Sequence, residues 1–372
     1  MKSIGITGQQ GFVGSHIYNQ VSLLKEEFKL IPFERNFFED GDTLKGWVKQ
    51  CDVIIHLAAV NRHPDAQLIH DTNINLVQLL IDACSAAAHT PHILFSSSTQ
   101  EERDNLYGQS KRTGRERLQR WSGDTGATVT GLIIPNVFGP FGKPFYNSVV
   151  ATFCHQLCNG QQPSIDTDGY LKLIYVDELA KVFIEAIRKQ ENNPEKKVLH
   201  TSELYVSEIL NKLMDYKACY IEKGNMPLLP DAFSLNLFNT FRSYIDHSTY
   251  FPFKLTQHAD NRGAFIEIIR LQIGGQISFS TTHPGITRGN HFHTRKIERF
   301  TVIRGKALIQ LRKFNTTEVF NFVFDGDEPS YVDMPVWFTH NMKNIGTEDL
   351  YTVFWINEPF NAETPDTNFE TV

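Results

Sequence analysis

The 372-residue chain lacks a long apolar run, an excess of basic residues and a repetitive tract. No window approaches the ~20 consecutive apolar residues that a membrane helix needs, so we expect no membrane span. A formal net charge of -6 is unlike the basic footprint of a protein that binds nucleic-acid phosphates, which favours a small-molecule partner. A chain with 41% hydrophobic residues and no low-complexity segment is also unlike a disordered protein.

Cysteine is scarce, with five residues in the whole chain. The spacing of Cys154 and Cys158 differs from the C-x2-C of zinc knuckles, so we expect buried thiols in a reducing compartment. The opening MKSIGITG runs directly into an apolar strand and does not have the pattern of a signal peptide. We therefore expect a cytoplasmic protein.

A glycine turn lies near the start of the chain. In MKSIGITGQQGFVG, a short apolar strand precedes Gly8, Gly11 and Gly14, and helical spacing of apolar residues follows. Such a turn lets backbone N–H groups and a helix N-terminus face a pyrophosphate. The three glycines alone are equally typical of an ordinary turn, but alternating strands and helices follow, as a doubly wound parallel sheet requires. Further buried strands are predicted at residues 28–35, 51–60 and 92–100.

The last of these strands contains three serines near its end, including Ser98, and Tyr107 and Lys111 follow it. In Y-x3-K the two side chains share one helix face, so we expect the ammonium to favour the ionised phenol. A tyrosine with a lowered pKa can pass a proton to or from an alcohol oxygen, with Ser98 as a second hydrogen-bond partner. An isolated Y-x3-K is usually only part of a helix surface; the preceding glycine turn and serine strand favour a catalytic role here.

Five motifs in order, TGQQGFVG, HLAA, SSS, YGQSK and PNVFGP, resemble the extended short-chain dehydrogenase/reductase family over about residues 1–243. The resemblance implies a Rossmann fold, a nicotinamide cofactor and, most often, a nucleotide-sugar substrate. It implies that Ser98, Tyr107 and Lys111 are the catalytic residues. The residues that it places at the cofactor are Gly8, Gly11, Phe12, Val13, Gly14, Leu57, Ala58, Tyr107 and Lys111. Those that it places at the substrate are Ser98, Asn136 and Asn147.

Two residues at the end of the second predicted strand bear on the choice of cofactor. Arg35 can pair with the 2′-phosphate of NADPH, whereas Glu34 lies where an acid would bond a free ribose and repel that phosphate. We predict NADPH, with NADH as the alternative. The serine motif continues as Thr99-Gln100 and lacks the Asp-Glu pair of the sugar 4,6-dehydratases, which favours a net reduction.

The character of the chain changes near residue 245. Helical periodicity gives way to short alternating runs, separated by turns such as NRG, HPG and DGD. Such a pattern predicts a closed barrel or jelly roll. We therefore predict two domains, an α/β Rossmann domain with a doubly wound parallel sheet over residues 1–245, and an all-β domain over residues 246–372.

The second domain contains GNHFHTRKIERFTVIRG, in which two histidines precede a glutamate. A period of two places His291 and His293 on one strand face, and Glu298 is expected to begin a strand that returns alongside through the turn at Gly305. A later segment, MPVWFTHNMKN, adds His340. Three imidazoles and one carboxylate suit a divalent metal such as zinc with an open position. Any one of these histidines taken alone would more often be a hydrogen-bonded core residue.

The spacing of these residues resembles the first motif of the cupin family over its full length, within a resemblance that covers about residues 248–372. Pro335, His340 and Asn344 match most of the second motif, but Trp337 stands where glycine is expected. The metal ligands that the resemblance implies are His291, His293, Glu298 and His340. DNRGAF and RGNH also resemble the metal-free deoxysugar 3,5-epimerases of the cupin class, in which His291 would be the catalytic base. An inert barrel is the third alternative.

A reductase of this kind followed by a cupin resembles, from end to end, the bifunctional enzymes of capsular polysaccharide and O-antigen precursor synthesis. The resemblance implies that the cupin domain epimerises C3 of UDP-2-acetamido-2,6-dideoxy-4-hexulose. The first domain would then reduce the C4 ketone with NADPH to UDP-2-acetamido-2,6-dideoxy-L-talose, on the way to UDP-N-acetyl-L-fucosamine. We also expect a homodimer. Two alternatives remain open: a single-activity reductase whose barrel serves dimerisation or binding, and a nucleotide-sugar 4-epimerase with tightly bound NAD.

Overall fold

The computed structural model describes residues 1–261 and 263–372, so Arg262 of the DNRGAF motif lies outside the described residues. The chain forms two compact units, which comprise Met1–Thr152 with Thr167–Val206, and Phe153–Asp166 with Ser207–Val372. The helices after residue 206 therefore belong to the same unit as the barrel, and the predicted domain boundary at 245/246 stays a prediction. Within the described part of the chain, no helix combines the length and apolar character that crossing a membrane requires.

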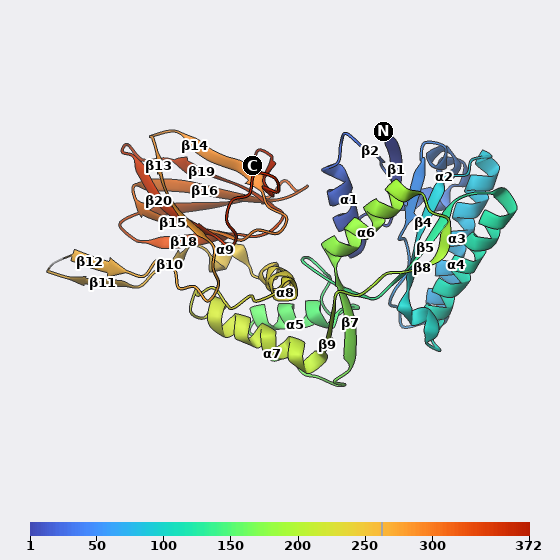
Figure 1. Cartoon of the computed structure of the whole chain (residues 1–372), viewed down its shortest axis with the longest axis horizontal. Coiled ribbons are helices and arrows are strands. Elements are labelled where there is room, and N and C mark those ends of the chain that lie inside the picture. The colour runs from blue at the N-terminus through green and yellow to red at the C-terminus, as the bar shows by residue number, and fades with distance from the viewer. Residues whose placement is uncertain (262) are drawn as a thin grey trace. The chain divides into compact units, whose positions relative to one another are not determined.

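Six parallel strands form the main sheet of the first unit, in the order β2-β1-β3-β4-β5-β8 (Figure 1). They are β1 (Lys2–Thr7), β2 (Phe28–Ile31), β3 (Val53–His56), β4 (His92–Ser98), β5 (Val129–Ile134) and β8 (Asn193–Lys197). The order reverses between β1 and β3, and open α/β sheets bind ligands outside the carboxyl ends of their strands at such a switch point.

Helices cover both faces of this sheet, so the predicted doubly wound fold is confirmed. The helices are α1 (Phe12–Ser22), α2 (Gly41–Val48), α3 (Ala66–Ala87), α4 (Leu106–Thr125) and α6 (Val176–Lys189). Val53 and Ile55 of β3 pack in one core with α1 and α6, whereas Ile54 packs in the other with α2, α3 and α4. Strands covered on both faces are apolar at every position, which is why they were visible in the sequence as continuous apolar runs.

Shorter elements complete the first unit. Two 3-10 helices follow β2 and β4, and a small sheet has the order β6-β7-β9. These elements are η1 (Arg35–Glu39), η2 (Thr99–Glu102), β6 (Asn136–Phe138), β7 (Tyr170–Tyr175) and β9 (Ser202–Tyr205). The PNVFGP motif thus contains β6, and the three serines of the SSS motif end β4.

The helical part of the second unit precedes its strands. It contains most of α5 (Val149–Cys158), followed by α7 (Val206–Tyr216), a π-helical turn η3 (Lys217–Ile221), α8 (Ala232–Arg242) and α9 (His247–Tyr250). Helices α8 and α9 come directly before the strands, near the change in sequence character at about residue 245. All five cysteines are free thiols, and Cys154 of α5 is buried while Cys158 is partly buried.

Two antiparallel sheets form the barrel, in the orders β10-β18-β15-β20-β13 and β17-β16-β19-β14-β21 (Figure 1). The strands of the first sheet are β10 (Phe253–Lys254), β13 (Gln276–Thr282), β15 (Glu298–Arg304), β18 (Ser330–Met334) and β20 (Leu350–Ile356). Those of the second are β14 (Thr287–Phe292), β16 (Lys306–Lys313), β17 (Val319–Asp325), β19 (Phe338–Asn344) and β21 (Asn368–Phe369). A separate hairpin joins β11 (Gln257–Asp260) to β12 (Gly263–Ile266). The expected all-β architecture is confirmed.

The prediction that the strand of Glu298 returns alongside its neighbours through Gly305 is wrong. Strand β15 pairs with β18 and β20, whereas β16, which follows Gly305, pairs with β17 and β19 in the facing sheet. Gly305 has a φ of +86°, which only glycine adopts readily, and it turns the chain from one sheet to the other. Glu298 therefore faces the histidines across the barrel.

The interior of the barrel is apolar around the candidate ligands. Ala307, Ile309 and Leu311 of β16 are buried, and the residues between them are more exposed, which is the period of two of a strand with one inner face. His340 of β19 lies opposite Leu311 in register, so its side chain lies on the same inner face. The sheet pairing thus places this imidazole inside the core.

Candidate active sites

The glycine turn joins β1 to α1 at the switch point of the parallel sheet. Gly8 has a φ of +74°, and a Cβ there would lie 2.9 Å from the backbone nitrogen of Ala58. A Cβ at Gly14 would lie 2.2 Å from the carbonyl oxygen of Gly8. Among the described residues, no side chain caps the start of α1 at Gly11. The turn therefore excludes larger residues and leaves helix N–H groups for an anion such as a pyrophosphate.

Thr7 holds the ends of β1 and β3 together beside this turn. Its hydroxyl accepts hydrogen bonds from the N–H groups of Leu57 at 3.2 Å and Ala58 at 3.3 Å, and lies 2.9 Å from Nδ1 of His56. Burial, assisted by the charge of Lys111, lowers the pKa of His56 to about 3, so the ring is neutral. Sequence reasoning missed the role of Thr7, although its position directly before Gly8 was a signal.

The residues predicted to select the cofactor both lie after β2. Glu34 and Arg35 are exposed, and Arg35 begins η1. Gln9 of the glycine turn donates a hydrogen bond through Nε2 to the carbonyl oxygen of Phe33 at 3.0 Å, which joins the turn to this segment. Phe12 and Val13 lie in the first turn of α1. The predicted cofactor residues thus lie at the carboxyl edge of β1, β2 and β3 or on α4. Both residues predicted to select the cofactor, Glu34 and Arg35, lie at this edge.

Tyr107 and Lys111 lie one turn apart on α4, as the spacing predicted. The ammonium of Lys111 lies 5.9 Å from the centre of the Tyr107 ring and donates to the carbonyl oxygen of Ser96 at 2.9 Å. Ser98 ends β4, where its hydroxyl accepts from the N–H of Gln100 at 3.2 Å. Strand β4 and helix α4 therefore position the serine and the tyrosine–lysine pair.

The predicted lowering of the tyrosine pKa is wrong for this structure. Burial, with a smaller contribution from Tyr146, raises the pKa of Tyr107 to about 12. Burial lowers the pKa of Lys111 to about 8, against the opposing charge of Glu101. Burial is the main cause of the shift of Tyr107, and the ammonium of Lys111 lies 5.9 Å from the centre of its ring. A phenol that keeps its proton is nevertheless the form that a reduction needs, since the new alkoxide must receive a proton.

A buried ion pair below these residues was not found from the sequence. Arg115 of α4 donates to both oxygens of Glu101 at 2.9–3.1 Å and to Glu195 at 2.8 Å, and the Ser97 hydroxyl donates to Glu101 as well. These contacts fasten α4 to the end of β4, and therefore fix the helix that carries Tyr107. No local sequence pattern distinguishes such a pair from surface charges.

The two asparagines predicted to bind substrate lie at different places in the first unit. Asn136 is exposed at the start of β6, and its Nδ2 donates to a backbone carbonyl of β7 at 3.2 Å. Nδ2 of Asn147 donates to the carbonyl oxygen of Asn61 at 3.3 Å, which ties its loop to the segment after β3. Contact of either residue with a substrate stays a prediction.

The structure brings the four predicted metal ligands together inside the barrel. One donor atom from each of them lies within 4.8 Å of the others. Nε2 of His293 lies 3.1 Å, and Nε2 of His340 3.3 Å, from Oε2 of Glu298. The ring centre of His291 lies 4.6 Å from that of His340. Strand β14 supplies His291, the residue after its end is His293, and β15 and β19 supply Glu298 and His340, so the groups come from both sheets.

Two of the histidine rings are oriented by hydrogen bonds from the nitrogen that faces away from the centre of the cluster. Nδ1 of His293 donates to the carbonyl oxygen of Asp366, and Nδ1 of His340 donates to that of Phe338 at 3.1 Å. Because a carbonyl oxygen only accepts, these nitrogens carry the protons and each Nε2 presents its lone pair to the centre. Both Nε2 atoms and Oε2 of Glu298 are buried, and none has a hydrogen-bond partner within the described residues. Converging buried lone pairs suit a divalent cation.

The charges of the cluster agree with that chemistry. Burial, reinforced by the two other rings, lowers the pKa of His291 to about 4. Burial alone would lower the pKa of His293 and raise that of Glu298, but the close contact between the two groups outweighs it, so the pKa of His293 is raised and that of Glu298 lowered. The lowered pKa values of His291 and Glu298 give the neutral ring and the ionised carboxylate that bind metals, whereas the raised pKa of His293 favours a protonated ring, whose proton a metal would have to displace.

Two residues with positive φ shape the surroundings of the cluster. Asn290, with a φ of 59°, forms a bulge in β14 between Gly289 and His291, and bulges re-aim the side chains beside them. Trp337, which replaces the cupin glycine, has a φ of 62°, a conformation that costs a non-glycine residue about 1–3 kcal/mol. Its N–H donates to the carbonyl oxygen of His293 at 2.8 Å, so the replacement leaves the ligand cluster in place.

Comparison with known proteins gives matches over both units. The NAD dependent epimerase/dehydratase family matches residues 4–200, and the polysaccharide biosynthesis C-terminal domain matches residues 258–368. The UDP-2-acetamido-2,6-beta-L-arabino-hexul-4-ose reductase of Pseudomonas aeruginosa is 31% identical over 364 residues, which cover 97% of this chain and 96% of that protein. The spore coat polysaccharide biosynthesis protein SpsL of Bacillus subtilis is 28% identical over 123 residues, which cover 30% of this chain and 82% of SpsL.

A solved structure matches the whole chain. The crystal structure of the capsular polysaccharide assembling protein CapF from Staphylococcus aureus is 32% identical in sequence, with a TM-score of 0.64, and the match covers 100% of both chains. The order of a parallel nucleotide-binding sheet and an antiparallel barrel is therefore common to both proteins.

Proposed function

We propose a bifunctional nucleotide-sugar enzyme, because this chain belongs to the NAD dependent epimerase/dehydratase family and matches CapF over its whole length. The barrel epimerises C3 of UDP-2-acetamido-2,6-dideoxy-4-hexulose, and the first unit then reduces the C4 ketone to UDP-2-acetamido-2,6-dideoxy-L-talose. This product leads to UDP-N-acetyl-L-fucosamine for capsule or O-antigen synthesis. The observation that carries the second activity is the convergence of four donor atoms inside the barrel.

Tyr107 is the proton donor of the reduction. Its pKa of about 12 keeps the phenol protonated until an alkoxide forms at C4. The ammonium of Lys111 stabilises the phenolate that is left, and the hydroxyl of Ser98 holds the ketone oxygen. NADPH, bound at the glycine turn, supplies the hydride. The exposed guanidinium of Arg35 supports NADPH over NADH, and Glu34 beside it supports the alternative.

The barrel removes and returns the proton at C3. A divalent metal such as zinc, held by His291, His293, Glu298 and His340, would supply a Lewis acid for the enolate oxygen. The apolar inner face of the barrel excludes water from the enolate. In the metal-free alternative, His291 is the base: it is the one partly exposed member of the cluster, and a pKa of about 4 keeps its ring neutral and able to accept a proton.

The homodimer belongs to the same proposal. Ile277 and Phe279 of β13 are 60% and 59% exposed, and among the described strands β13 pairs only with β20. An exposed, apolar edge strand is a surface that a second copy can cover. Light scattering on the Phe279→Lys variant tests this assignment: a mass that falls from two chains to one supports it, and an unchanged mass moves the interface elsewhere.

Supplying the 4-keto sugar in deuterated water, with and without NADPH, tests both activities. Without NADPH we expect deuterium at C3 of the ketone, and with NADPH the reduced product with deuterium at C3, followed by NMR. NADPH oxidation without deuterium would favour the single-activity reductase. A 4-epimer formed without added cofactor, together with NAD that stays bound through purification, would favour the 4-epimerase.

His291→Ala, with His283→Ala as control, tests the role of the cluster. His283 is an exposed histidine of the same unit, paired with Asp349 at 2.7 Å. We expect His291→Ala to lose bound metal and C3 exchange, and His283→Ala to keep both. Normal exchange by a metal-free His291→Ala protein would favour an inert barrel.

A further inference from the structure

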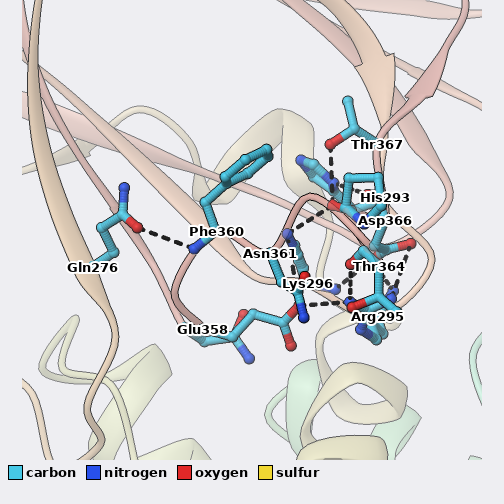
Figure 2. A network of polar contacts seen from close by, with 12 residues as sticks. Gln276, His293, Arg295, Lys296, Glu358, Phe360, Asn361, Thr364, Asp366 and Thr367 are labelled. Atoms are coloured by element: carbon cyan, nitrogen blue, oxygen red, sulfur yellow. Dashed lines mark hydrogen bonds and ion pairs between the residues drawn. The ribbon is translucent and has the colours of Figure 1, made fainter.

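The carboxylate of Asp366 lies buried against the loop that joins two of the candidate metal ligands (Figure 2). Its side chain is 2% exposed, and its Oδ1 accepts from the N–H of Thr294 at 3.0 Å and from the Thr294 hydroxyl at 2.7 Å. Oδ2 accepts from the N–H groups of Arg295 at 3.0 Å and Lys296 at 3.1 Å. Three consecutive amides on one carboxylate fix the path of the chain from His293 towards Glu298.

The backbone of the same residue holds a ligand ring directly. The carbonyl oxygen of Asp366 accepts from Nδ1 of His293, which fixes the tautomer and orientation of that ring. Asp366 has a φ of 45°, a conformation that few non-glycine residues adopt. One residue thus holds both the imidazole and the loop that follows it, by different atoms.

The residues on either side of Asp366 are fastened to the same loop. The ammonium of Lys296 donates to the carbonyl oxygen of Pro365 at 2.7 Å, and Arg295 donates to that of Thr364 at 2.8 Å. Figure 2 shows Arg295, Lys296 and Thr364 gathered around Asp366. Lys296 is buried, and the carbonyl oxygen of Pro365 and the carboxylate of Glu358, 3.6 Å away, satisfy its charge.

The end of the chain reaches the other two ligands. Phe369 of β21 pairs with His291 of β14. The N–H of Glu370 donates to the carbonyl oxygen of Asn290 at 3.0 Å, and its carboxylate accepts from the hydroxyl of Thr339, the residue before His340. Residues 364–372, which we call the C-terminal strap, therefore touch each of the four ligands or a residue within two positions of it.

We propose that the C-terminal strap sets how tightly the barrel retains its metal, with Asp366 as the positioning residue. The inference rests on the metal site of the proposed function. It says that the residues that hold the metal ligands in place belong to a segment outside both cupin motifs. Hydrogen-bond partners of ligating histidines contribute ~10–100-fold to metal affinity, because they hold the ring in its binding orientation. Asp366→Ala keeps the carbonyl oxygen that accepts from His293 but removes the carboxylate that fixes this residue against the loop, so the ring loses its orienting support and we expect the effect to lie in that range.

Zinc affinity of the full-length protein measures the effect. Apo protein is titrated with Zn²⁺ in competition with a chromogenic chelator, for wild type, Asp366→Ala and Glu363→Ala. Glu363 is an exposed acid directly before the strap and serves as the matched control. We expect a dissociation constant ~10–100-fold higher for Asp366→Ala and unchanged for Glu363→Ala. Asp366→Asn keeps an acceptor oxygen but loses the charge and the second acceptor, and should lie between.

A second readout separates positioning from general damage. At saturating Zn²⁺, C3 exchange by Asp366→Ala should return to near the wild-type rate, whereas a distorted barrel would stay inactive. Equal zinc affinity in wild type and Asp366→Ala would overturn the role of the strap and leave the metal site standing. A wild type that binds no zinc would overturn both. Should Asp366→Ala fail to fold, Asp366→Asn carries the same comparison, and an unchanged affinity there overturns the inference.

Discussion

The two candidate sites are built in opposite ways. In the first unit, Ser98, Tyr107 and Lys111 follow one another along a single strand and the next helix. In the barrel, the four candidate ligands come from three strands in two sheets, and the end of the chain supports them. A site of the first kind is specified by local sequence, whereas a site of the second kind exists only once distant strands have paired.

The two sites also differ in how they treat charge. Lys111 is buried with a backbone carbonyl as its hydrogen-bond acceptor, and its pKa falls to about 8. In the barrel, Nε2 of His293, Nε2 of His340 and Oε2 of Glu298 are buried without a hydrogen-bond partner within the described residues, and burial lowers the pKa of His291 to about 4. The first site therefore holds a buried cation, while the second holds buried lone pairs of the kind that bind a divalent cation.

The largest expected effect comes from removing the proton donor of the first site alone. Tyr107→Phe should slow NADPH oxidation by ~10²–10⁴-fold, because a general acid contributes that much. Deuterium incorporation at C3 should continue at the wild-type rate. A stopped assay for NADPH and NMR for deuterium measure both activities in one sample. Loss of both activities would contradict their assignment to two separate sites.

The next effect concerns the frame of the barrel. Arg299, next to Glu298 on β15, donates to both oxygens of Asp333 at 2.7 and 2.8 Å, and the Tyr220 hydroxyl donates to Asp333 at 2.6 Å. Asp333→Ala would leave a buried guanidinium without its carboxylate, which costs about 3–5 kcal/mol. Urea unfolding should show this loss.

The matched control for that variant is a surface pair of the same barrel. Lys306 and Asp325 lie 3.2 Å apart and are both largely exposed, so Lys306→Ala should change the free energy of unfolding by less than about 1 kcal/mol. Similar losses in Asp333→Ala and Lys306→Ala would contradict the assigned role of the buried pair.

Lys111→Met should lower activity and raise stability. Moving the pKa from 10.5 to about 8 means that the charged form is disfavoured in the folded state, by about 3 kcal/mol below pH 8. This cost shrinks as the pH rises from 8 and disappears above 10.5, so the advantage of Lys111→Met should shrink over the same interval. Thermal unfolding at pH 7 and pH 10 checks the sign. Lys181→Met, at an exposed position of α6, should show no such trend.

The smallest effect concerns cofactor choice. Arg35→Ala should raise the KM for NADPH ~10-fold, since one exposed charge-assisted contact to the 2′-phosphate is lost, and should leave the KM for NADH unchanged. Glu34→Ala should lower the KM for NADPH by a smaller factor. Equal changes for both cofactors in steady-state kinetics would remove Arg35 from the phosphate site.

The difference between the two sites explains how much the sequence could predict. The parallel sheet, the glycine turn and the Tyr107–Lys111 pair follow from local periodicity, and the cupin spacing indicated the ligand set. The sequence could not predict that β15 lies in the sheet opposite β14 and β19, because turn residues such as Gly305 do not reveal which strands pair. The high pKa of Tyr107 also depends on burial, which spacing alone does not report.

The supporting contacts were beyond prediction for a related reason. Asp366 bonds the loop after His293 from more than seventy positions away, and no period or motif joins the two segments. The Arg115–Glu101 pair is closer in sequence but resembles any surface charge pattern until the fold buries it. Such partners become visible only when tertiary structure shows which polar groups have lost water.

The most direct test of whether two separate sites act in sequence is to mix two variants, each of which lacks one of the two activities. Tyr107→Phe should epimerise the ketone but not reduce it. His291→Ala has an intact first unit, which can reduce the epimerised ketone, but its barrel should not form that ketone. The mixture, given NADPH and the 4-keto sugar, is expected to form the reduced product and consume NADPH. A mixture as inactive as either variant alone would contradict the account.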